Sequence, residues 1–293
     1  TALTMRGSWH EGVALLTGAL ANANERGLVR VALRAANNLA SFLTVTDPRA
    51  SVARTREVLA TSHRLGLRSY DIYSAGNGTA ALLTGEWAWY RATLDELREA
   101  MTDPSAIRDI DILRLSLDAW CREIDDGPIR DSLEASRAEG DVQLEVGNLS
   151  GLVELAYARG DDASAAALGE ALAGTTIGAS TPTCALAARL ALRTGDRARH
   201  DRIVAMLALP GGASDVDLAL LEGTRHAVDG RVPDAIERFR WAIETARSYG
   251  LRFGVAWAGL AMAEALPPDT PGLATVVAET RAILDDLGAV MLL

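Results

Sequence analysis

VDLALLEGTRHAVDGRVPDAIERFRWAIETARSYG, residues 216–250, is the stretch that decides the fold. A helical stretch over 216–229 ends at Gly230, and a second helical stretch follows that glycine. Gly223, seven residues before the turn, lets the two helices approach closely, and Gly230 can adopt the positive φ that ends a helix. Three residues of the second stretch share one face: Ala235, Phe239 and Ala242. The segment therefore predicts an antiparallel helical hairpin.

Turns recur along the chain at a regular interval. Gly160, Gly195 and Gly230 lie 35 residues apart, and each interrupts a pattern rich in Ala and Leu. Counting back from them adds turns at these positions: Asp125-Asp126-Gly127, Gly85, Asp47-Pro48 and Gly7. Seven turns at intervals of 35 to 40 residues indicate an α-solenoid, in which each helix pair buries its apolar face against neighbouring pairs. We expect one helical-repeat domain over residues 1–293.

The second helices share a common stop signal. Gly27-Leu28, Gly66-Leu67 and Gly250-Leu251 each combine a glycine that suits a left-handed cap with a leucine that packs back on the preceding turn. No segment has the sustained alternation of a strand between turn signals. The sequence therefore predicts an all-α protein with about fourteen helices.

The spacing in residues 216–250 resembles that of the tetratricopeptide repeat, in which small and aromatic residues occupy the same positions. His226 departs from the family by standing where an aromatic residue is usual. Weaker copies occur around Gly78 and Gly85 and over residues 152–165, whereas residues 102–140 have the fewest family-like positions. The resemblance implies a right-handed α-solenoid of about seven antiparallel helix pairs.

The last residues, 280–293, read TRAILDDLGAVMLL. A closing helix of this kind resembles the end of the tetratricopeptide-type region in large bacterial regulators. Two groups share it: LuxR-type ATP-binding transcription regulators, and proteins that join a nucleotide-cyclase domain and an ATPase to such repeats. Because the chain opens at Thr1, almost at a turn, we expect it to be a piece of a longer regulator.

The amino-acid composition argues against several classes of function. The net charge of −10 argues against direct contact with nucleic acid, which needs clustered cations to neutralise phosphates. All 29 cations are Arg, so a phosphate-binding or Schiff-base lysine is excluded. No run approaches the roughly 18 apolar residues that span a bilayer. We therefore expect a cytoplasmic protein without membrane contact.

Catalytic and metal-binding patterns are missing from the sequence. The four histidines are scattered without an HxxxH or HExxH spacing, and the two cysteines lie 63 residues apart. Acidic pairs such as Asp161-Asp162 stand at or near predicted helix ends, where carboxylates cap free N–H groups. No G-x-S-x-G elbow or dinucleotide-binding loop occurs. We expect no enzyme activity, no catalytic residues, no metal and no cofactor.

Candidate binding residues lie on the first helices, which line the concave surface in tetratricopeptide-like superhelices. The aromatic candidates are Trp120 and Trp257. Asn is a poor helix former, so helix propensity does not explain why asparagine occupies four positions of these helices: Asn37, Asn38, Asn77 and Asn148. In the family that the chain resembles, groove Asn and Arg side chains bind the backbone or carboxylate of extended peptides, which adds Arg114, Arg189, Arg225 and Arg252. The four asparagines do not keep one register relative to their turns, so solvation or interhelical hydrogen bonding is the alternative.

These observations favour a sensor or scaffold domain without enzyme activity. A curved helical array would bind a peptide, a protein or a small effector in its groove and signal to an attached output domain. Self-association is the alternative, with exposed apolar surface pairing two copies into a homo-oligomer.

Overall fold

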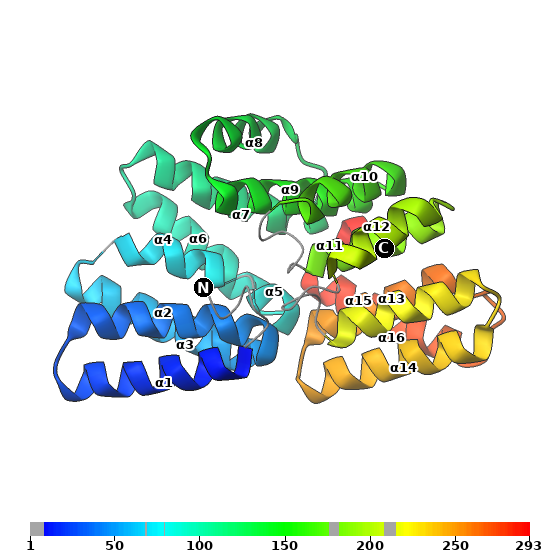
Figure 1. Ribbon diagram of the computed structural model, residues 1–293, viewed down its shortest axis with the longest axis horizontal. Coiled ribbons are helices and arrows are strands. Elements are labelled where there is room, and N and C mark those ends of the chain that lie inside the picture. Colours follow the sequence, from blue (N-terminus) through cyan, green and yellow to red (C-terminus); the bar gives the residue numbers. More distant parts are fainter. Residues whose placement is uncertain (1–8, 68, 79, 176–181, 208–214) are drawn as a thin grey trace. The chain divides into compact units, whose positions relative to one another are not determined.

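The computed structural model describes residues 9–67, 69–78, 80–175, 182–207 and 215–293 (Figure 1). Over these ranges every regular element is a helix and none is a strand, which confirms the all-α prediction. The chain divides into two compact units, Thr1–Arg114 and Leu115–Leu293. The predicted turn at Gly7 lies outside the described residues.

The first unit consists of antiparallel helices joined by short turns. In chain order its helices are α1 (Trp9–Glu25), α2 (Val29–Thr46), α3 (Pro48–Leu65), α4 (Ser69–Asn77), α5 (Ala80–Thr84), α6 (Trp87–Ala100) and most of α7 (Pro104–Cys121). Helix α2 packs against both α1 and α3. At the turn between α2 and α3, the Asp47 carboxylate accepts a hydrogen bond from the Ala50 N–H at 3.0 Å, and Pro48 occupies the first helical position.

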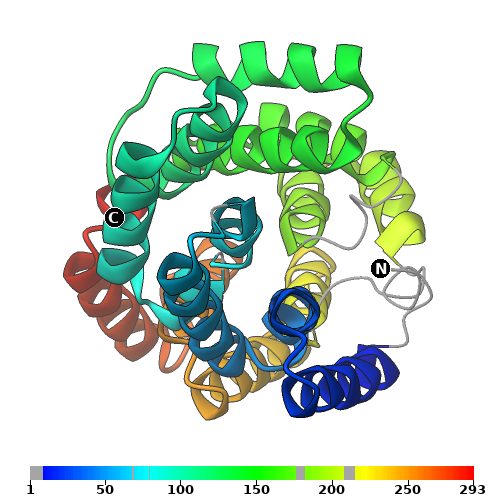
Figure 2. The same cartoon turned by 90° about the vertical axis from the view of Figure 1, so that its left-hand side faces the viewer.

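The second unit begins within α7 and continues in helix pairs. Its helices are α8 (Gly127–Glu139), α9 (Val142–Ala158), α10 (Asp162–Ala173), α11 (Pro182–Arg193), α12 (Arg197–Leu207), α13 (Asp215–Val228), α14 (Val232–Ser248), α15 (Arg252–Ala265) and α16 (Leu273–Leu287), followed by a 3-10 turn (Val290–Leu292). Neighbours in sequence are neighbours in space, as in α13 with α14 and α15 with α16. Helix α8 packs alongside α9, the first helix of the next pair (Figures 1 and 2).

The turn glycines have the backbone conformation that the sequence predicted. Gly160, Gly195 and Gly230 have φ of 75°, 80° and 74°, and Gly85 has φ of 82°. The Gly-Leu stops are also confirmed, because the N–H of the leucine bonds back to the last helical turn. The Leu251 N–H, for example, donates to the Ala246 carbonyl at 2.9 Å.

The predicted small-residue positions let the helices of a pair touch. A Cβ atom added to Gly223 of α13 would lie 3.0 Å from the ring of Phe239 on α14. Gly78 faces the ring of Tyr90 in the same way in the first unit. Both rings are buried. The two segments can approach closely because a glycine, which has no side chain, faces the aromatic ring.

We expect Gly230→Ala to lower the free energy of unfolding of the second unit by about 1 kcal/mol, because an L side chain is strained at positive φ. The added methyl group has no neighbour within 4 Å, so no clash contributes. Gly147→Ala is the matched control: this glycine lies inside α9 with equally open space, and the change should stabilise the helix by about 0.5–1 kcal/mol. Urea unfolding of the three proteins checks the opposite signs, and equal effects would contradict the argument.

Candidate functional site

Four aromatic rings meet at the centre of the second unit. They come from three helices: Trp120 from α7, Tyr157 from α9, and Phe253 and Trp257 from α15. The ring centroids of Tyr157 and Trp257 are 5.3 Å apart, and those of Trp120 and Trp257 are 5.6 Å apart, both edge to face. Edge-to-face contacts at these distances stabilise aromatic clusters beyond the area they bury. Side chains from α7, α9 and α15 are therefore in contact, although α15 lies far from the other two in the sequence.

Arg189 of α11 lies against this cluster. Its guanidinium carbon is 5.4 Å from the ring centroid of Trp257, within range for a cation–π contact. The side chain is almost fully buried at 2% exposure, yet Nε, Nη1 and Nη2 have no hydrogen-bond partner among the described residues. A buried guanidinium without acceptors is costly, because the aromatic face replaces only part of the lost hydration. Five N–H donors are thus available to an incoming acceptor group.

A polar network borders the cluster. Arg193, one turn after Arg189 on α11, forms ion pairs with Glu264 at 2.5 Å and with Asp162 at 3.1 Å. The Tyr157 hydroxyl donates to the second Glu264 oxygen at 2.8 Å. Burial raises the pKa of Tyr157, and the charge of Glu264 raises it further, so the hydroxyl remains a donor. Arg189 is the member of this group that has no acceptor. We define the Arg189 site as Arg189, Trp257, Trp120, Tyr157 and Phe253.

Three of the ten predicted binding residues meet here: Trp120, Arg189 and Trp257. Trp120 is 3% exposed, so it packs inside the unit, whereas Trp257 is partly exposed. Asn148, also in the second unit, is buried and donates to the Ser132 hydroxyl at 3.1 Å. Arg225 is exposed on α13. Arg252 begins α15 and pairs with Asp286 of α16 at 2.6 Å.

The remaining predicted residues belong to the first unit. The Asn77 amide donates to the Asn37 side-chain oxygen at 2.9 Å, which ties α4 to α2. Asn38 is half-buried on α2. Arg114 forms an ion pair with Asp95 of α6. Asn37, Asn77 and Asn148 thus make interhelical hydrogen bonds, the alternative that the sequence left open.

Sequence reasoning missed Tyr157, Phe253, Arg193 and Glu264. Phe253 and Trp257 are four residues apart, so they share one helix face and could have been proposed as a pair. Tyr157 and Glu264 are 107 residues apart, and no local spacing predicts their contact.

In two of the acidic pairs, one carboxylate accepts a backbone N–H at the start of the following helix. The Asp161 carboxylate accepts from the Ser164 N–H at 3.1 Å, and Asp125 accepts from the Gly127 N–H at 3.1 Å. Within the described part of the chain, no group of His, Cys, Asp and Glu could hold a metal ion. No helix there is long and apolar enough to cross a bilayer.

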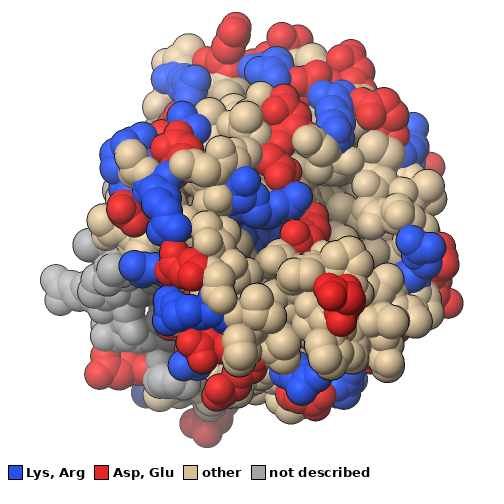
Figure 3. Space-filling view, turned by 90° about the vertical axis from the view of Figure 1, so that its right-hand side faces the viewer, with Lys and Arg blue, Asp and Glu red and all other residues tan. Residues whose placement is uncertain are grey.

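Charge on the molecular surface is mixed. On the face drawn in Figure 3, basic and acidic side chains are interspersed among uncharged residues, and neither sign forms a continuous field. This face does not have the basic stripe that a phosphate backbone requires.

We expect the second unit to lose stability as pH rises through the titration of Glu154, one turn before Tyr157 on α9. Burial raises the Glu154 pKa from 4.5 to about 7, although the Thr183 hydroxyl donates to it at 3.3 Å. At pH values between the unfolded pKa of 4.5 and the folded pKa of about 7, the folded state binds more protons than the unfolded state. The free energy of unfolding therefore falls as pH rises through this window, by on the order of 2 kcal/mol.

Glu154→Gln should flatten this slope, and urea unfolding from about pH 5 to about pH 7 measures it. Glu170, whose pKa is lowered to about 2 by hydrogen bonds from Arg202 and Arg199, titrates below this window and has the opposite sign. A slope that survives Glu154→Gln would contradict the assignment.

No family model matches the chain, and no curated protein matches it.

Proposed function

We propose that this chain is a non-enzymatic sensor or scaffold domain of a bacterial transcriptional or signalling regulator, which binds a peptide, a protein or a small effector on the inner face of its helical array. The single observation that carries the proposal is the buried Arg189 guanidinium, whose three nitrogens have no acceptor among the described residues while its face contacts Trp257. Such a group suits a bound oxyanion or carbonyl, because guanidinium forms bidentate hydrogen bonds with planar acceptors.

The helical pairing supports this proposal, since stacked hairpins provide extended inner surfaces for ligands. The tetratricopeptide-like spacing of residues 216–250 favours a right-handed solenoid and a regulator of the LuxR-type or cyclase/ATPase type. In such a protein the repeat region binds the effector, and a separate domain supplies the output.

Native mass spectrometry of the chain purified from its own host tests the proposal. We expect a species heavier than the 31.0 kDa chain by the mass of one effector, and Arg189→Met should lose that added mass. Arg281→Met, at an exposed arginine of α16 in the same unit, is the control and should retain it. A ligand-free mass for the unmodified chain, with no added mass from host extract, would contradict the proposal.

Self-association is the second candidate, favoured by exposed apolar side chains on α1 and α2. Leu15 is 64% exposed and Val31 is 53% exposed. Isolated apolar residues are common on surfaces, but several on adjacent helices indicate a contact area. Sedimentation across a range of concentrations distinguishes the candidates: a mass that rises with concentration, and falls back in Leu15→Glu or Val31→Glu, supports self-association, and a constant mass of one chain contradicts it.

A further inference from the structure

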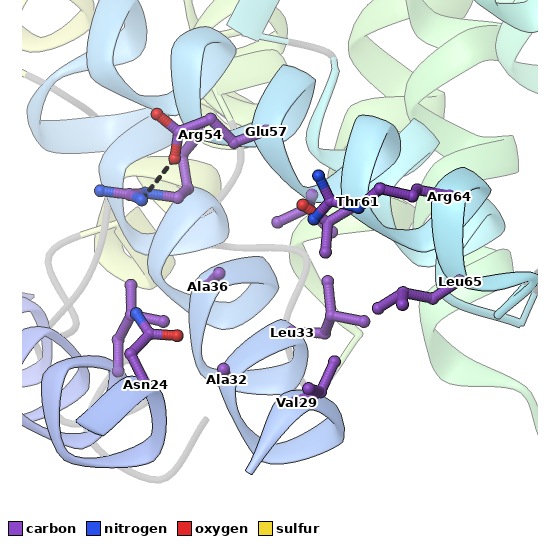
Figure 4. Close-up of a pocket in the computed structure, with 12 residues that line it drawn as sticks. Asn24, Val29, Ala32, Leu33, Ala36, Arg54, Glu57, Thr61, Arg64 and Leu65 are labelled. Atoms are coloured by element: carbon purple, nitrogen blue, oxygen red, sulfur yellow. Dashed lines mark hydrogen bonds and ion pairs between the residues drawn. The ribbon is translucent and has the colours of Figure 1, made fainter. Parts of the chain in front are cut away.

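The first unit has an open groove between α1 and α3, with α2 as its floor (Figure 4). We name it the α1–α3 groove. It has a volume of about 350 Å³. Apolar side chains line the end near the α1–α2 turn: Leu20, Val29, Leu33 and Leu65. Arg54, Glu57 and Arg64 extend along its α3 side.

The groove exposes apolar surface that the unit itself does not cover. Leu33 and Val58 form a buried floor at 4% and 2% exposure, as part of the core cluster with Ala36. Above that floor, Val29 and Leu65 remain 45% and 44% exposed. In Figure 4 the side chains of Val29, Leu33 and Leu65 come from α2 and α3 and lie close to one another. Covering them would remove a contiguous apolar patch from water.

In the second unit, ion pairs cross two of the corresponding seams between successive second helices. Glu170 of α10 pairs with Arg199 at 2.9 Å and with Arg202 at 2.5 Å, both on α12. Arg247 of α14 pairs with Glu279 of α16 at 2.9 Å. In both seams, an arginine on one second helix meets a carboxylate on the neighbouring second helix.

On the α1 side of the α1–α3 groove, no described lining residue supplies such a carboxylate. Helix α1 contributes Leu20 and Asn24 to its lining, and neither is acidic. Arg54 is satisfied within its own helix by Glu57 at 2.5 Å. Arg64 is exposed and has no ion pair among the described residues. The groove therefore combines an uncovered apolar patch with an arginine, Arg64, that has no ion pair among the described residues. The arginines in the two seams of the second unit do have acidic partners.

We propose that the α1–α3 groove binds an acidic amphipathic helix of a partner protein. Apolar side chains of that helix would cover Val29, Leu33 and Leu65, and a carboxylate beside them would pair with Arg64. A groove bounded by two parallel helices suits a third helix, whose anchors recur at three- and four-residue spacing. This site is separate from the Arg189 site, and the two proposals stand or fall independently.

Two labelled helical peptides with the same leucine face test the proposal, one with glutamate and one with lysine at the flanking positions. Fluorescence anisotropy with the full chain should give at least about tenfold tighter binding of the glutamate peptide, the scale of one well-placed charge pair. The net charge of −10 repels acidic peptides in general, so this preference would report the groove itself.

Charge reversal provides the specific control. Arg64→Glu should lower the affinity for the glutamate peptide at least about tenfold and raise that for the lysine peptide. Arg281→Glu, at an exposed arginine of α16, should change neither. Val29→Glu should abolish binding of the glutamate peptide, and circular dichroism should show that each variant keeps its helix content.

Three results would overturn the proposal. The first is failure of both peptides to bind, and the second is equal affinity for the two. The third is a groove already filled by a second copy of the chain, which sedimentation would detect as a dimer that Val29→Glu dissociates.

Discussion

Phe239→Ala should lower the free energy of unfolding of the second unit by about 3–5 kcal/mol, the range for deleting a buried aromatic ring. The ring is fully buried and lies over Gly223, which has no side chain to fill the space that the ring leaves. Its neighbours on the same face, Ala235 and Ala242, are equally buried but small. Chemical denaturation monitored by circular dichroism measures the loss.

Trp241→Ala is the matched control for this prediction. Trp241 is an aromatic residue on the same helix, but it is 44% exposed. Its removal leaves no cavity, so we expect a change below about 1 kcal/mol. Comparable losses for the two variants would mean that ring size, rather than the contact with Gly223, determines the stability of this helix pair.

Arg189→Met should raise the free energy of unfolding of the second unit by about 1–3 kcal/mol and abolish effector binding. Methionine fills a similar volume without a charge, and replacing buried ionic groups with apolar ones is often stabilising by such amounts. The gain is expected here because, in the part of the chain that the structure describes, none of the three guanidinium nitrogens has a hydrogen-bond partner to lose. Thermal unfolding without effector, together with native mass spectrometry, measures the two effects.

Arg193→Met, one turn further along α11, should have the opposite effect on stability. Arg193 bridges Glu264 and Asp162, so its loss removes the ion-pair partner of two partly buried carboxylates. If Arg189→Met destabilises the unit as Arg193→Met does, Arg189 has a structural role and the proposed site loses its support.

Local sequence features predicted the helices and their ends. Gly230 and the Gly250-Leu251 stop were readable because positive φ favours glycine and because a left-handed cap is completed within a few residues. The contact between Gly223 and Phe239 was also predictable, since a hairpin brings together residues on either side of one turn. The division of the chain within α7 left no comparable signal in the sequence.

The sequence by itself thus determined the all-α class, the turns and the packing within a helix pair, because these depend on interactions across a few tens of residues. Only the tertiary structure decided which side chains meet at the centre of the second unit. Trp120 and Trp257 are on helices far apart in the chain, and their contact depends on small rotations accumulated over several pairs. Only the tertiary structure likewise shows that Arg189 has no hydrogen-bond acceptor among the described residues, because this depends on the acceptors that neighbouring helices supply.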